Sequence, residues 1–169
     1  TTHSYIEALK HKTKAKLAEE LGAQSLTREE ASKKISDILK SAGSHFKTIA
    51  ETESTKVRNL GKVAGITKVA ADMGVTDPYC YFITVKDSKV CKFCLDAHTT
   101  DGNIPKVYKL SEIKISYLTK EERGHMCSVS GQHPRCRCSL VMLPAGYGFK
   151  NGRIVFIGLD HDEYKAQKN

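Results

Sequence analysis

The sequence predicts an α+β protein, in which a helical N-terminal half is followed by a small antiparallel sheet with a long irregular insert. Three observations lead to this prediction. Apolar residues recur at intervals of three and four up to about residue 73, which is the spacing of amphipathic helices. Short runs of β-branched and aromatic residues follow, and such runs are typical of strands. The polar residues 95–132 lie between them without clear periodicity, and so long an irregular segment needs something to hold it.

Three helices are predicted within residues 1–73. The first has one apolar and one lysine-rich face and ends at Gly22. The second begins at the "TREE" sequence, Thr27 to Glu30, where a hydroxyl and a carboxylate three residues apart satisfy the free amides of a helix start. We expect this helix to end at Gly43 and a third helix, over about residues 44–73, to dock on the domain that follows.

Glu53 lies on the apolar side of the third predicted helix. An unpaired buried charge costs several kcal/mol, so this carboxylate is either solvated at the edge of that face or paired. Arg137, inside the triplet "CRC", is a candidate partner because its forked guanidinium fits a carboxylate. We therefore predict a Glu53–Arg137 pair that docks the third helix on the cysteine-bearing segment.

Three runs predict strands, namely "YCYFITVK" at residues 79–86, "CSLVML" at 138–143 and "RIVFIGL" at 153–159. The predicted organisation is a helical segment at residues 1–73, an α+β domain at 74–159 and a polar tail at 160–169.

The charge of the chain is basic but evenly distributed. Its 169 residues include 27 Lys and Arg against 19 Asp and Glu, for a net charge of +8. Residues 1–72 carry 13 basic and 9 acidic residues, and residues 73–169 carry 14 and 10. This distribution argues against a dedicated nucleic-acid tail, although a basic surface favours salt-sensitive contact with phosphate or acidic proteins. No run approaches the roughly 18 apolar residues of a membrane span, so no membrane segment is expected.

Soft metal ligands are crowded into two short stretches. Cys91 and Cys94 form a CxxC pair, and His133, Cys136 and Cys138 follow within "GQHPRCRCSLVML". Zinc takes thiolate sulfur and imidazole nitrogen in tetrahedral geometry, and CxxC supplies two sulfurs from one tight turn. Four of these five residues are therefore predicted to bind a structural Zn²⁺. Its binding would tie the insert to the strands on both sides.

The fourth ligand is open between Cys136 and Cys138. We expect the side chains of Cys136 and Cys138 to point to opposite sides, so that one of these cysteines binds the metal and the other packs in the core. Cys136 is the first choice, and Cys138 is the main variation. His98, His125 and Cys127 are candidates outside this set.

Other interpretations of the cysteines are weaker. Six cysteines allow three disulfides, but a chain with a real core does not need them; buried free thiols remain a further alternative. A zinc deaminase needs H-x-E before its cysteines, whereas "HDE" at residues 161–163 follows them. A Cys–His nucleophile at Cys127 with His125, or at Cys80, has no supporting local signature. We therefore expect no enzymatic activity.

Three segments taken together resemble the domain of the Mu F-like minor head proteins of tailed bacteriophages. They are "IAETESTKVRNLGKVAG", "YFITVKDSKVCKFCLDAHTTDG" and "GQHPRCRCSLVML", within about residues 46–143. The chain departs from the family pattern with Glu51 before the Thr-Glu pair, with Phe82 where Trp is commoner, and with a longer insert. The positions that match the family motif are Thr52, Glu53, Phe82, Asp87, Cys91, Cys94, Asp101, Gly102 and His133 to Cys138.

The resemblance implies a structural virion component. Such a minor head protein would act in capsid or portal assembly or in genome ejection, and would contact the portal, other capsid proteins or packaged DNA. It would lie inside the capsid or at the portal vertex, and in the host cytoplasm during assembly. The alternative is a zinc-ribbon-like module that binds nucleic acid without reading its sequence.

Overall fold

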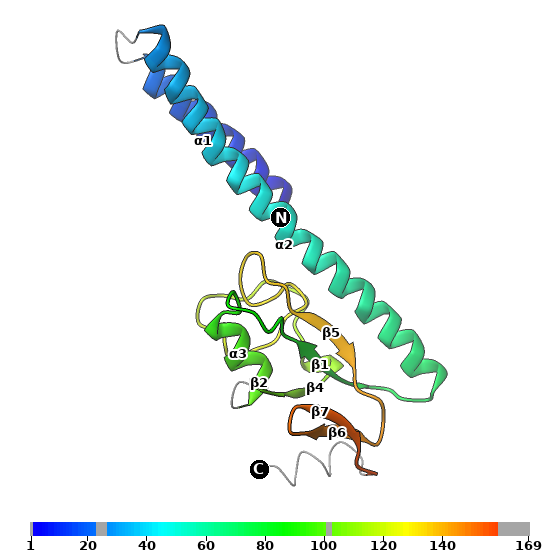
Figure 1. Ribbon diagram of the computed structural model, residues 1–169. Coiled ribbons are helices and arrows are strands. Elements are labelled where there is room, and N and C mark those ends of the chain that lie inside the picture. Colours follow the sequence, from blue (N-terminus) through cyan, green and yellow to red (C-terminus); the bar gives the residue numbers. More distant parts are fainter. Residues whose placement is uncertain (1, 23–26, 101–102, 159–169) are drawn as a thin grey trace. The chain divides into compact units, whose positions relative to one another are not determined.

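The computed structural model describes residues 2–22, 27–100 and 103–158 (Figure 1). The chain divides into two compact units, Thr1–Glu51 and Thr52–Asn169. The boundary between the two units lies after Glu51, inside the helix Arg28–Asp72, and not after residue 73 as predicted. The predicted polar tail at residues 160–169 lies outside the described residues. Among the helices that are described, none has the length and apolar character needed to cross a membrane.

The first unit is a hairpin of two helices. The helix α1 (Thr2–Gly22) lies alongside the first part of α2 (Arg28–Asp72) (Figure 1). The predicted start of the second helix is confirmed in detail. The Glu30 carboxylate accepts the Thr27 amide at 2.9 Å, and the Glu30 amide donates to the Thr27 hydroxyl at 3.3 Å. Each residue thus satisfies a free amide of the helix start.

The predicted helix end at Gly43 is wrong. The helix α2 is continuous over 45 residues, so the described residues up to 73 form two helices in place of three. A glycine inside a helix costs about 1 kcal/mol, which lowers stability without ending the helix. The neighbouring Ala42 is only 8% exposed, and burial of such residues offsets that cost.

The second unit is built on a three-stranded antiparallel sheet, which confirms the predicted fold class. The strand β1 (Tyr79–Ile83) lies between β4 (Val107–Lys109) and β5 (Ser139–Met142). Cys80 is opposite Tyr108 in one pair, and Phe82 is opposite Leu140 in the other. The strands predicted near residues 79 and 138 are therefore present, whereas β4 carried no sequence signal strong enough to predict it.

Smaller elements complete this unit. The strand predicted near residue 153 is present as β7 (Arg153–Phe156), which forms a hairpin with β6 (Tyr147–Lys150). Its turn contains Asn151 and Gly152, whose φ angles are 51° and 73°. Asn-Gly suits such a turn because both residues tolerate positive φ. The element bounds are β2 (Thr99–Thr100), β3 (Ile104–Pro105), a short 3-10 helix (Leu110–Glu112), β6 (Tyr147–Lys150) and β7 (Arg153–Phe156).

The core of the second unit lies between α2, the sheet and the insert. Phe82 and Leu140 are at most 1% exposed. The side chains alternate along β1, so Tyr81 contributes to a separate cluster with Leu143 and Phe149. The main cluster consists of Ile66, Cys80, Phe82, Cys94, Ile113, Cys127, Val129, Cys136, Cys138 and Leu140. Three of its ten members, Cys94, Cys136 and Cys138, are candidate metal ligands, so part of the predicted ligand set lies in the core.

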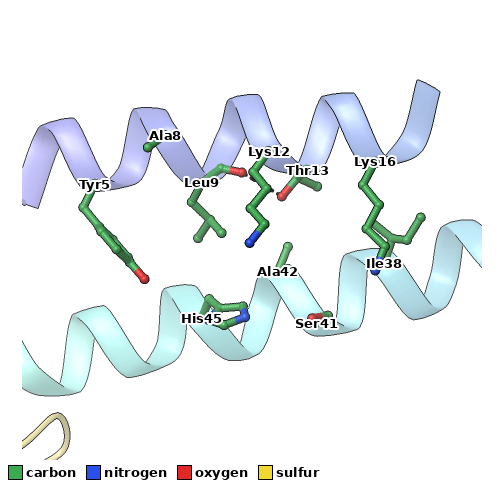
Figure 2. Close-up of a pocket in the computed structure, with 10 residues that line it drawn as sticks. All are labelled: Tyr5, Ala8, Leu9, Lys12, Thr13, Lys16, Ile38, Ser41, Ala42 and His45. Atoms are coloured by element: carbon green, nitrogen blue, oxygen red, sulfur yellow. Dashed lines mark hydrogen bonds between the residues drawn. The ribbon is translucent and has the colours of Figure 1, made fainter. Parts of the chain in front are cut away.

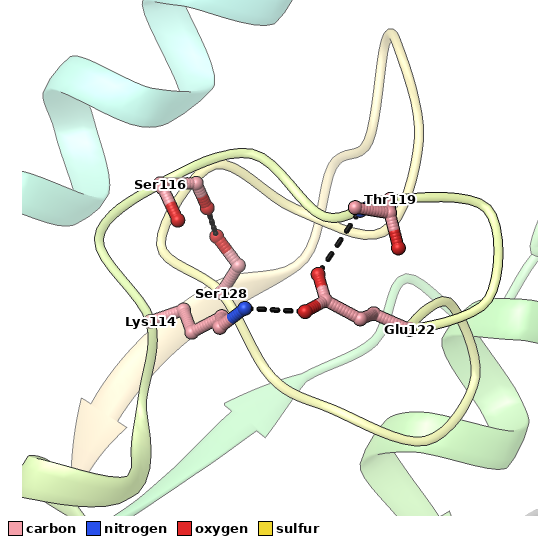
Figure 3. A network of polar contacts seen from close by, with 5 residues as sticks. All are labelled: Lys114, Ser116, Thr119, Glu122 and Ser128. Atoms are coloured by element: carbon pink, nitrogen blue, oxygen red, sulfur yellow. Dashed lines mark hydrogen bonds and ion pairs between the residues drawn. The ribbon is translucent and has the colours of Figure 1, made fainter.

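The irregular insert has hydrogen bonds of its own (Figure 3). The Glu122 carboxylate pairs with the Lys114 ammonium and accepts the Thr119 amide at 3.0 Å. The Ser128 hydroxyl donates to the Ser116 carbonyl at 2.6 Å. These bonds link the outgoing and returning halves of the insert.

Candidate metal centre

The CxxC pair lies at the start of a short helix, α3 (Lys92–His98). Cys91 is the residue that caps this helix, and its sulfur accepts the Cys94 amide at 3.4 Å. The helix start therefore directs both sulfurs to the same end of α3.

The second ligand segment is a tight loop before β5. Gly131 and Arg135 have φ angles of 83° and 63°. A Cβ at Gly131 would lie 2.5 Å from the Cβ of Cys136, so only glycine fits there. The predicted divergence of the Cys136 and Cys138 side chains is wrong. Both sulfurs lie within 4.8 Å of the Cys94 sulfur, and even in a strand residues two apart share a face.

The five predicted ligands are brought together around Cys94. Its sulfur lies 3.4 Å from His133 Nε2 and 3.7 Å from Cys136 Sγ. Cys91, Cys94 and His133 form one group of donor atoms within 4.8 Å of one another, and Cys94, Cys136 and Cys138 form a second. The six cysteines are free thiols, so the alternative of three disulfides is wrong.

A small cavity lies among these donor atoms. Its volume is about 30 Å³, which suits a single ion or water molecule. Four of the five candidate ligands line this cavity, namely Cys91, Cys94, His133 and Cys138, whereas Cys136 does not. A set of thiol sulfurs and one imidazole nitrogen is the donor set that zinc prefers, so the residues present fit a structural metal ion.

The surroundings of Cys136 stabilise a negative sulfur. Its pKa is lowered because the thiols of Cys138 and Cys94 donate to it, together with the backbone amides of Cys138 and Gln132. The pKa of Cys94 is raised, chiefly through its hydrogen bond to Cys136. These contacts favour the thiolate form of Cys136 over its thiol form.

A polar stripe on α2 fixes the backbone of the second ligand segment. Asn59 is fully buried, and its amide nitrogen donates to the carbonyls of Val129 at 3.0 Å and Cys138 at 3.2 Å. Its oxygen accepts the Leu140 amide at 3.2 Å. These bonds confirm the expectation that this part of the helix docks on the segment that follows.

Further members of the stripe lie one and two turns before Asn59. The Thr55 hydroxyl donates to the Cys136 carbonyl at 2.8 Å, and the Thr52 hydroxyl accepts the Arg135 amide at 3.0 Å. Thr55 and Asn59 were not among the predicted site residues. The available signal was their spacing, because Thr55 is three residues after Thr52 and Asn59 is four residues after Thr55, and polar residues repeating on a buried helix face need partners.

The predicted Glu53–Arg137 pair has different partners in the structure. Both guanidinium nitrogens of Arg137 donate to the Asp87 carboxylate, at 2.7 and 2.8 Å. This fork lowers the pKa of Asp87 to about 2. Glu53 accepts the Tyr117 hydroxyl. The sequence alone did not show whether Glu53 or Asp87 pairs with Arg137. Asp87 is far from Arg137 in the chain and is brought next to it only when the chain folds.

The outside ligand candidates lie elsewhere. Cys127 and His98 are buried together, with 3.4 Å between Cys127 Sγ and His98 Nδ1. His125 is exposed. Burial raises the pKa of the Cys127 thiol and of the Cys80 thiol to about 12 in each case. Both thiols are therefore protonated at neutral pH, and a protonated thiol is a poor nucleophile.

His98 makes the second unit sensitive to acid. Its ring stacks on Phe82 with 4.4 Å between centroids, and burial lowers its pKa to about 4. The unfolded chain, with a histidine pKa of about 6.5, therefore binds a proton that the folded chain excludes. The contribution of His98 to stability is complete above pH 6.5 and is lost progressively as the pH falls towards 4.

His98→Gln is expected to lessen the acid-induced loss of stability by about 1 kcal/mol between pH 7.5 and 5.5. Urea unfolding of variant and wild type at both pH values measures this difference. Loss of metal at low pH lowers the stability of the variant and of the wild type alike, so it cancels in the difference between their stabilities. The exposed His125→Gln serves as the control and should follow wild type. An identical pH dependence in His98→Gln would contradict the assignment.

Comparison of the chain with protein-family models, with curated proteins and with solved structures gave no match. Of the positions that carry the phage resemblance, Asp101 and Gly102 lie outside the described residues. The "HDE" sequence at residues 161–163 also lies outside them.

Proposed function

We propose that this chain is a structural, non-catalytic protein whose second unit is braced by one zinc ion. The observation that carries the proposal is the convergence of three cysteines and His133 from two distant segments on one small cavity, with the sulfur of Cys136 beside that of Cys94. A shell of four protein ligands leaves no coordination position for substrate, as in structural zinc sites. Zinc would supply the bond between the two segments and the positive charge that keeps the sulfurs ionised.

The fourth ligand in this proposal is Cys138, which lines the cavity, rather than Cys136, which does not. The lowered pKa of Cys136 argues the other way. An ion must have room beside each ligand, and the cavity provides that room beside Cys138. The sulfur of Cys136 is already occupied by backbone amides.

Cys138→Ser is accordingly expected to lower zinc affinity by at least about 100-fold, and Cys136→Ser by less than about tenfold. Competition with a chromophoric chelator measures both affinities. Both serines preserve size and backbone, so the pair is matched. A larger loss in Cys136→Ser would identify Cys136 as the ligand and reject this assignment.

The biological role that we propose is that of a minor head protein of a tailed bacteriophage, present in the virion and acting in capsid or portal assembly or genome ejection. The support is the motif resemblance together with the structural roles of its residues. Thr52 contacts the ligand loop, Cys91 and Cys94 begin α3, and Asp87 holds Arg137. The motif therefore marks residues that build and fix one site.

The virion proposal is tested with particles produced by a bacterial host that carries the phage gene. Quantitative mass spectrometry of purified virions should detect this chain at a few copies per particle, protected from added protease until the heads are opened. Detection of the portal in the same particles while this chain is absent would contradict the proposal.

The link between zinc and assembly is tested in the same host. Particles carrying Cys94→Ala should lack the chain or fail to assemble, whereas Cys80→Ala particles should resemble wild type. Normal particles that contain the Cys94→Ala chain would contradict the proposed structural role of the site.

A further inference from the structure

A groove in the first unit has the composition of an anion-binding site. It lies between α1 and the first part of α2 and encloses a cavity of about 340 Å³ (Figure 2). This volume falls in the range of about 300–1,000 Å³ that is usual for ligand pockets. The lining residues are Tyr5, Ala8, Leu9, Lys12, Thr13, Lys16, Ile38, Ser41, Ala42 and His45.

The floor of the groove is apolar and its rim is cationic. Ile38 and Ala42 are 9% and 8% exposed, so they form a closed floor on the α2 side. Lys12 and Lys16 extend from α1 towards α2, and His45 projects from the opposite helix (Figure 2). An apolar floor with a few polar groups at its edge is typical of sites for small organic groups.

The two lysines of the groove repel each other, and a bound anion would reduce this repulsion. Lys12 and Lys16 are four residues apart, so they project from the same face of the helix, and like charges at this spacing destabilise a helix. The ten lining residues include no Asp or Glu. A bound anion would therefore be held by two ammonium groups without opposition from a carboxylate in the lining.

Tyr5 adds an aromatic ring to the cationic groove. Its ring stands at one end of the groove and Lys16 at the other (Figure 2). The ring is 57% exposed, so one face can receive a planar group. A cationic track combined with an exposed aromatic ring is the arrangement by which proteins bind single-stranded nucleic acid without sequence preference.

We propose that this groove binds single-stranded nucleic acid, with phosphates at Lys12 and Lys16 and a base stacked on Tyr5. The site is separate from the metal centre, so it stands independently of the function proposed above. The positive charge of the chain is spread evenly and does not indicate where nucleic acid would bind. The proposal places that contact in one defined groove.

The test is the binding of a fluorescein-labelled oligothymidine by the full chain, measured by anisotropy at several salt concentrations. The double variant Lys12→Gln with Lys16→Gln should lose at least about tenfold in affinity. The slope of log affinity against log salt should fall by about 1.4, since each phosphate contact on a single strand contributes about 0.7. Tyr5→Leu should lose at least about fivefold, because stacking on an aromatic ring is lost.

The matched control is Lys14→Gln with Lys47→Gln, which removes the same charge from exposed positions of the hairpin outside the groove lining. It should lose less than about threefold, with helicity unchanged by circular dichroism in all variants. Equal losses in both double variants would overturn the proposal in favour of a diffuse basic surface. Absence of binding by wild type at 100 mM salt would also overturn it, and so would groove-dependent binding to phosphatidylglycerol vesicles that oligothymidine does not compete.

Discussion

Cys94→Ala is expected to abolish stoichiometric zinc binding and to unfold the unit Thr52–Asn169. Cys94 belongs to both groups of donor atoms, so its loss leaves neither group complete. Structural zinc contributes about 10–16 kcal/mol of binding free energy in small zinc domains, and this energy is folding energy. The free energy of unfolding should therefore fall by at least about 5 kcal/mol, which urea titration and elemental analysis of zinc can measure.

Cys80→Ala is the matched control for this variant. Cys80 and Cys94 are 0% and 2% exposed, so each substitution removes a buried sulfur from the same core cluster. Cys80→Ala should cost only about 1–2 kcal/mol, the expected cost of a small cavity, and should retain zinc. Similar losses of stability in both variants, with zinc content unchanged, would show that Cys94 contributes packing alone.

Asn59→Leu is expected to destabilise the same unit by about 3–6 kcal/mol. Leucine has a similar volume but leaves three buried backbone groups without their hydrogen bonds, those of Val129, Cys138 and Leu140. Each unsatisfied buried group costs about 1–3 kcal/mol. Because Cys138 precedes β5 directly, the variant should also bind zinc more weakly. Urea unfolding and chelator competition measure the two effects.

Thr55→Val provides the graded comparison. It removes one hydrogen bond, from the Thr55 hydroxyl to the Cys136 carbonyl, with almost no change of shape. Its expected cost is about 1–2 kcal/mol. If Asn59→Leu cost no more than Thr55→Val, the polar stripe would not be what holds the ligand segment on α2.

Local signals in the sequence predicted the fold class and selected five candidate ligands that the structure brings together. The capping pattern at Thr27 placed the start of α2, because cap and helix are neighbours in the chain. The five candidates could be named because zinc requires specific donor atoms, and few residue types supply them. The error at Gly43 arose because helix propensity is a weak preference that packing along the rest of α2 overrides.

Partner choice was harder to predict than residue type. Arg137 was expected to pair with a carboxylate, and it does, but the partner is Asp87 and not Glu53. The bonds of Asn59 join residues 70 to 81 positions apart. Such contacts depend on how the insert returns to the sheet, which no local pattern encodes. Whether Cys136 or Cys138 lines the cavity depends on the course of the loop before β5, which begins at Ser139.

The proposed zinc ion joins α3 to the segment before β5. Zinc K-edge X-ray absorption on protein purified without added metal, combined with zinc content per chain, tests this arrangement. One zinc per chain is expected, with three sulfur ligands at about 2.3 Å and one nitrogen ligand at about 2.0–2.1 Å. Folded protein that contains no metal, or a zinc ion surrounded by oxygen ligands, would contradict it.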